Sequence, residues 1–255
     1  MNEAMESSRL CALCQTMAKL HKSHIIPEFF FRMVYDEPAH QFHVVSDDPE
    51  KPEFFRQKGL WERLLCEECE QKMSKWEHYA KNTFVDGRGL LVKEQATSVV
   101  LQNLEYKTFK LFQLSLLWRM SISSLRFFEE VSLGPYEEKI RQALLREDPL
   151  SATDYPCVMT IIKISGQFHP SWITQPSRAR FRHQTVYWLI ICGFLYVYFV
   201  GNLSSSIAWA QLLLSENNQM TVPIGDARDL PFVSETITKL GTAIGKRKEN
   251  ALSGK

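Results

Sequence analysis

Two pairs of cysteines, Cys11-x-x-Cys14 and Cys66-x-x-Cys69, constrain this chain more than any other feature of its sequence. Four thiolates from two close pairs complete the tetrahedral shell of a structural zinc ion. Sulfur ligands are soft, so zinc or an iron–sulfur centre is favoured over magnesium or calcium. Neither pair lies in a β-α-β pattern, as a thioredoxin-like pair would, and two matched pairs argue against coincidence. We therefore expect a metal-fastened module in a reducing compartment, which predicts a cytoplasmic location.

The charge composition and one apolar segment limit the kinds of partner that the chain is expected to bind. Its 30 Lys+Arg against 29 Asp+Glu lack the strong positive field of a protein that binds duplexes non-specifically. Contact with DNA or RNA would therefore be local, or shared with a protein partner or a second copy. The run VYWLIICGFLYVYFV, residues 186–200, is shorter than the roughly 20 residues of a membrane-spanning helix. Its β-branched and aromatic residues predict two buried strands that meet near Cys192 and Gly193, so no membrane association is expected.

The order of the predicted elements indicates an α+β chain. We expect a small N-terminal module over residues 9–85, an α+β domain over 90–245 built from helices and an antiparallel sheet, and a disordered tail over 246–255. The DGRG sequence at 86–89 separates the first two, and the acidic insert at 46–59 is predicted to be a loop. Composition and periodicity predict helices over 68–83, 104–124, 135–146 and 231–244, and strands over 157–164, 180–191 and 194–200.

The N-terminal third resembles the HNH endonucleases, which are ββα-metal nucleases with a zinc-fastened, treble-clef-like frame. The resemblance is carried by the two CxxC pairs, by the sequence His24-Ile-Ile-Pro27 between them, and by the helix expected after the second pair. It implies that His24 is the general base that activates water. It also implies that the residue before this histidine and the residue after the last cysteine hold a divalent cation, Mg²⁺ or Mn²⁺, against the scissile phosphate of DNA or RNA, and it points to anti-phage defence.

Three features depart from the family pattern. Ser23 lies where the family usually has a carboxylate, and no asparagine lies between Pro27 and Cys66 to orient the base. Glu70 lies where the family usually has His or Asn, and as a hard oxygen ligand it could hold the catalytic cation. His21 is the nearest second ligand, with Asp36 behind it. The expectation is a metal-dependent nuclease that a partner recruits or activates; the alternative is a degenerate zinc-binding scaffold.

Three arginines form a further candidate site. Arg178, Arg180 and Arg182 alternate along the sequence SRARFRH, and in a strand they would share one face. Three guanidinium groups on one face could grip phosphates. They could equally be the polar side of an edge strand that is protected from aggregation.

Overall fold

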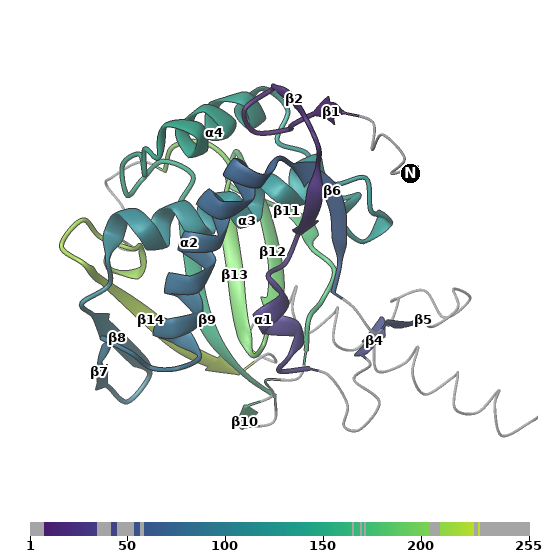
Figure 1. The fold of residues 1–255 in the computed structure, drawn as a ribbon. Helices are drawn as coiled ribbons and strands as arrows, with labels where there is room; N and C mark the ends of the chain where they lie inside the picture. Colours follow the sequence, from purple (N-terminus) through teal and green to yellow (C-terminus); the bar gives the residue numbers. More distant parts are fainter. Residues whose placement is uncertain are drawn as a thin grey trace, which may run out of the picture.

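The computed structural model has a mixed α+β fold, in which helices cover a large sheet (Figure 1). It describes residues 8–34, 42–44, 54–56, 59–164, 166–168, 170, 172–203, 210–226 and 229. The helices are α1 (Glu28–Phe31), α2 (Glu67–Phe84), α3 (Tyr106–Ile122) and α4 (Pro135–Arg146), with 3-10 turns over Arg126–Phe128 and Ala210–Leu212.

Small antiparallel strand pairs make up the part of the chain around the cysteines. Strands β1 (Arg9–Leu10) and β2 (Met17–Ala18) flank the first CxxC pair, and β3 (His21–His24) pairs with β6 (Trp61–Leu65). The chain runs directly from β6 into α2, so that β3, β6 and α2 form a strand–strand–helix unit. A third pair joins β4 (Phe42–Val44) to β5 (Phe54–Arg56).

The large sheet has the strand order β11-β12-β13-β9-β14-β8-β7, and β10 adds to β9. All neighbours are antiparallel except β14 and β9, which are parallel, so the expected antiparallel sheet is wrong at this one pair. Strand β14, from the far end of the described chain, lies between β8 and β9 and pairs with both. It thereby joins the β7–β8 hairpin to the later strands in a single sheet. The strands are β7 (Leu91–Glu94), β8 (Ser98–Gln102), β9 (Cys157–Ile164), β10 (Gln167–Phe168), β11 (Ser177–Phe181), β12 (Gln184–Ile191), β13 (Phe194–Phe199) and β14 (Gln219–Asp226).

The apolar run at residues 186–200 is a hairpin that is buried on both faces. Tyr187, Leu189 and Ile191 of β12 pack into the core beneath the helices, whereas Trp188 and Ile190 pack into a separate cluster. A strand that is buried on both sides has no polar alternation, which explains its resemblance to a membrane segment. Cys192 and Gly193, both at positive φ, form the turn predicted there. None of the described helices is both long and apolar enough to cross a membrane.

Helix α3 is the centre of the molecule. Every residue from Phe109 to Met120 is buried, and the helix packs against both α2 and α4. A helix that is apolar on nearly every face has no side for solvent, which explains this position. One continuous core cluster contains residues of α3, of the sheet and of the cysteine-bearing part of the chain.

Two buried arginines attach the second part of the chain to the first. Arg119 of α3 donates to the backbone carbonyl of His24, and Arg141 of α4 donates to the backbone carbonyl of Leu13. Both side chains are less than a tenth exposed. A buried guanidinium requires hydrogen-bond partners, so these contacts fix β3 and the first CxxC turn against α3 and α4. The boundary proposed at 86–89 stays a prediction, but the core runs across it.

Several sequence predictions can be compared with the observed elements. The helices near 68–83, 104–124 and 135–146 and the strands near 157–164 and 194–200 are confirmed within two residues. The strand expected over 180–191 is wrong, because Arg182 and His183 form a turn between β11 and β12. Residues 54–56 of the expected loop form β5. Apart from Gly59, the rest of that insert lies outside the described residues. So do the helix expected at 231–244, the tail at 246–255 and Asp36.

Leu117→Ala tests the central role of α3. Because Leu117 is fully buried, its truncation is expected to lower the free energy of unfolding by about 2–5 kcal/mol. Lys107→Ala, at an exposed position of the same helix, is the matched control and should change it by less than about 0.5 kcal/mol. Urea unfolding followed by circular dichroism measures both, and equal effects would contradict a central α3.

Candidate metal centre and histidine site

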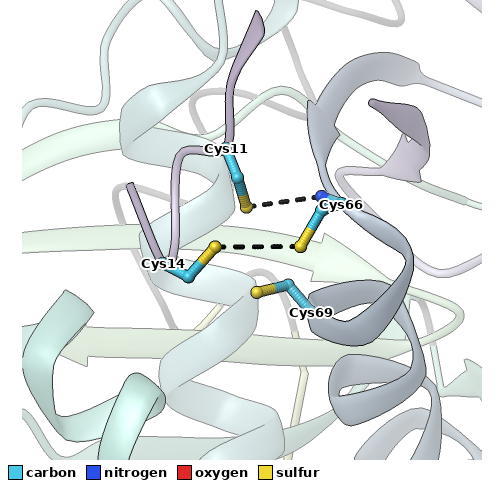
Figure 2. Close-up of side chains that lie close together, drawn as sticks. All are labelled: Cys11, Cys14, Cys66 and Cys69. Atoms are coloured by element: carbon cyan, nitrogen blue, oxygen red, sulfur yellow. Dashed lines mark hydrogen bonds between the residues drawn. The ribbon is translucent and has the colours of Figure 1, made fainter. Parts of the chain in front are cut away.

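The four paired cysteines converge on one point, although 51 residues separate the two pairs (Figure 2). Cys11 and Cys14 lie in the turn between β1 and β2, Cys66 caps the N-terminus of α2, and Cys69 lies in its first turn. Their sulfur atoms all lie within 4.8 Å of one another. The Cys14 and Cys66 sulfurs are 3.7 Å apart, close to the edge of about 3.8 Å in a tetrahedron with zinc–sulfur bonds of about 2.3 Å.

Backbone hydrogen bonds hold the two cysteine turns together. The Ala12 N–H donates to the Leu64 carbonyl at 2.9 Å, and the Cys66 N–H donates to the Cys11 sulfur at 3.3 Å. Gln15, at φ 59, completes the tight turn after Cys14. N–H donors to sulfur favour the thiolate form, which is the form that binds metal. The arrangement is therefore compatible with a closed, four-sulfur structural zinc site, which matches the sequence prediction.

The thiol pKa values show how a cation would change this cluster. Burial alone would raise the pKa of Cys14, but hydrogen bonds from Thr16, Cys11 and Cys66 lower it to about 6. Burial raises the pKa of both Cys66 and Cys69. Four thiolates packed together without a cation would repel one another, so binding of zinc is expected to release protons.

His24 forms a pair with a carboxylate that follows it on the chain. Its Nε2 atom lies 3.1 Å from Oε2 of Glu28, in the first turn of α1, and both side chains are about one-third exposed (30% and 33%). The two atoms are not aligned for a hydrogen bond, so the contact is electrostatic. In a neutral ring whose proton lies on Nε2, facing Glu28, the Nδ1 lone pair would be available. Burial lowers the pKa of His24; the charges of Glu28 and Glu77 oppose that shift, whereas Arg119 and Lys22 add to it. The ring is therefore kept neutral near pH 7.

Glu70 contacts Ser23 rather than His24. The fully buried Ser23 hydroxyl donates to the Glu70 carboxylate, which joins β3 to α2. Burial raises the pKa of Glu70, and the Ser23 hydrogen bond opposes the shift in part. Successive side chains of a strand point to opposite faces, so the side chains of Ser23 and His24 diverge. The structure therefore gives no contact between the two residues expected to be catalytic, His24 and Glu70.

A buried ion pair influences the pKa values of both His24 and Glu70. Arg119 lies 2.6 Å from the Glu77 carboxylate, and its charge and that of Glu77 influence the pKa values of both His24 and Glu70. Glu77 lies on the same helical face as Glu70, and its pairing with Arg119 shows that this face packs toward α3. Arg119 Nη2 is buried with no hydrogen-bond partner.

The remaining candidate ligands do not gather around a second cation. His21, half-buried on β3, influences the pKa of Glu70 electrostatically. Within the described ranges, the four cysteines are the one group of three or more His, Cys, Asp or Glu side chains close enough to share a metal ion. A catalytic cation at Glu70 and His21 therefore stays a prediction. The expectation that Arg178, Arg180 and Arg182 share one strand is wrong, because Arg182 lies in the β11–β12 turn at positive φ; Arg178 and Arg180 are exposed on β11.

Two residues of this site, Glu28 and Arg119, were not predicted from the sequence. The spacing of His24 and Glu28, four residues apart beside Pro27, is a local signal that could have indicated the pair. Arg119 gives no local signal, because it lies 95 residues from His24 in an apolar helix.

Cys66→Ser tests the metal centre. The wild type is expected to contain one zinc ion per chain, and the variant to lose it and unfold at a lower temperature, since metal binding is linked to folding. Cys157→Ala, at a buried cysteine outside the cluster, is the matched control and should retain zinc. Elemental analysis and thermal unfolding measure both; zinc retained by Cys66→Ser would exclude the four-cysteine site.

The lowered pKa of His24 predicts a pH-dependent contribution to stability. Between the lowered folded-state pKa and the unfolded value of roughly 6.5, the unfolded chain binds more protons than the folded one, so stability falls as pH falls through this window. His24→Gln removes this contribution. The unfolding free energy of the wild type should therefore fall more steeply than that of the variant below about pH 6.5. Parallel curves in urea titrations would contradict the burial of the imidazole.

Comparison of the chain with protein-family models, with curated proteins and with solved structures found no match. Its function is therefore inferred from its own residues.

Proposed function

We propose that this chain hydrolyses phosphodiester bonds of DNA or RNA in the manner of the HNH endonucleases, with His24 as the general base. The observation that carries the proposal is the partly exposed His24, held at Nε2 by Glu28, on a strand–strand–helix unit fastened by four cysteines. Glu28 would take the orienting role for which the sequence offered no asparagine.

The chemistry of such a site follows from the His24–Glu28 pair. The Nδ1 atom of a neutral His24 accepts a proton from water as the water oxygen attacks the phosphorus atom. Glu28 stabilises the imidazolium that forms, and the phosphorus–oxygen bond to the leaving group breaks, with a solvent proton completing the alcohol. The lowered pKa of His24 keeps the base unprotonated near neutral pH.

When bound, a divalent cation such as Mg²⁺ or Mn²⁺ would neutralise the negative charge of the phosphate. Mg²⁺ usually keeps several water ligands, so one or two carboxylates and the substrate phosphate can complete its shell. Glu28 of α1, which lies beside His24, and Glu70 of α2, to which the resemblance points, are the two carboxylates that would hold the cation. The near-neutral charge of the chain favours a partner that recruits or activates it, as anti-phage defence would require.

A second candidate is a zinc-fastened scaffold that binds a partner without catalysis. One observation favours it: the carboxylate of Glu70 bonds to Ser23 and that of Glu77 to Arg119. These partners compete with a cation for the carboxylate oxygens. Residues 9–85 would then hold a surface in place rather than a reaction centre.

Cleavage of plasmid DNA, single-stranded DNA and structured RNA with Mg²⁺, Mn²⁺ or Ni²⁺ separates the two candidates. His24→Ala is expected to lower the rate by about 10²–10⁴-fold, as loss of a general base does. His78→Ala, at an exposed histidine of α2, is the matched control and should cleave like the wild type. Glu28→Gln should move the acid limb of the pH–rate profile to lower pH, because Glu28 raises the pKa of His24.

Zinc content is measured for each variant, so that a lost fold is not mistaken for lost catalysis. Cleavage that survives in His24→Ala would exclude His24 as the base. Absence of cleavage in the wild type under all conditions would favour the scaffold.

A further inference from the structure

The outer face of the β3–β6 pair carries two positive side chains directly opposite each other. Lys22 of β3 is the register partner of Arg63 of β6, and both are exposed. Like charges at directly opposed positions destabilise a strand pair. Neither Lys22 nor Arg63 makes an ion pair with an acidic side chain in the part of the chain that the structure describes. Among the described residues, the repulsion of the pair is thus not offset by an acidic side chain.

The neighbouring residues fix these two charges in place. The Lys22 ammonium lies 4.5 Å from the centroid of the Trp61 ring, which holds its long side chain over β6. One guanidinium nitrogen of Arg63 donates to the Leu20 carbonyl at 3.1 Å, and within the described residues its other donors remain for an external acceptor. A lysine and an arginine held in this way present a point charge and a planar fork, which are the two side-chain groups that bind phosphate.

The same face carries His24. Residues two apart on a strand share a face, and His24 is the register partner of Trp61, so His24, Trp61, Lys22 and Arg63 lie together on the outer side of the pair. The charge of Lys22 acts on His24, which agrees with this placement. Ser23 and Glu62 point to the opposite, inner side, where Ser124 and Ser123 donate to Glu62.

We infer that Lys22 and Arg63 form the phosphate-binding face of this chain, on which the backbone of a nucleic acid lies next to His24. This inference rests on the proposed function, since it identifies the surface that would present the substrate to the proposed base. It replaces the arginines of β11 as the principal nucleic-acid contact. A local site of two cations also agrees with the near-neutral charge of the chain, which gives no general attraction to polyanions.

Binding is tested with the full chain carrying His24→Ala, so that substrate is not cleaved, and with short fluorescein-labelled duplex and single-stranded DNA and RNA. Lys22→Glu with Arg63→Glu is expected to weaken binding at least tenfold. It should also reduce the slope of log affinity against log salt by about 0.9 per lost phosphate contact for duplex, or about 0.7 for single strands. Arg178→Glu with Arg180→Glu, which makes the same change in charge on β11, is the matched control and should do neither.

Three outcomes overturn the inference. The first is equal weakening by both double variants, which would show a general charge effect. The second is binding that Lys22→Glu with Arg63→Glu leaves unchanged, and the third is no binding by the parent protein. Zinc content and thermal unfolding verify the fold; Lys22→Glu alone should unfold at or above the temperature of the wild type, because it removes the opposed like charges. Lys22→Gln with Arg63→Gln repeats the test without reversed charge.

The two proposals fail in different ways. Binding through Lys22 and Arg63 in a chain that cleaves nothing would leave the phosphate face intact and refute hydrolysis. Cleavage by the wild type with an unchanged KM in Lys22→Glu with Arg63→Glu would refute the phosphate face and leave His24 as the base.

Discussion

The convergence of four sulfur atoms at the N-terminus of α2 is the constraint on which the N-terminal part of the fold depends. It ties the turn at Cys11 and Cys14 to the junction of β6 and α2, across more than fifty residues of chain. The paired strand β3 is thereby held between two fixed points. Without a metal the four sulfur atoms would share no common bonding partner: burial raises the pKa of Cys66 and Cys69, and protonated thiols form no strong bond to one another.

Buried arginines connect this cysteine-bearing part to the larger sheet and helices. Arg119 and Arg141 each donate to a backbone carbonyl in the first 24 residues and each pairs with a glutamate, Glu77 or Glu138. Removal of a partner from such a pair leaves a charge in the core, so the contacts specify one arrangement of the two parts. The position of β3, and therefore of His24, is set as much by α3 as by the cysteines.

The divergence of Ser23 and His24 shapes the functional proposal. The inner face of β3 uses Ser23 and Glu70 to join strand to helix, and the outer face carries His24, Lys22 and Trp61. The acid that serves His24 is Glu28, a close neighbour on the chain, whereas Glu70 serves the packing of α2. Chemistry on the outer face would thus be separated from the structural contacts on the inner one.

Local sequence signals determined much of this protein. The CxxC spacing indicated the cysteine cluster, composition and apolar patterning indicated α2, α3 and α4, and the residues near Cys192 and Gly193 indicated that the apolar run is two strands joined by a turn. Short-range patterns suffice for these features because capping, burial and turn geometry involve residues close together on the chain. The long-range pairings were decided only by the tertiary structure: β14 beside β9, Arg119 on His24 and Glu77, and Lys22 opposite Arg63. These contacts depend on how distant elements pack around α3, and no single stretch of sequence encodes that geometry.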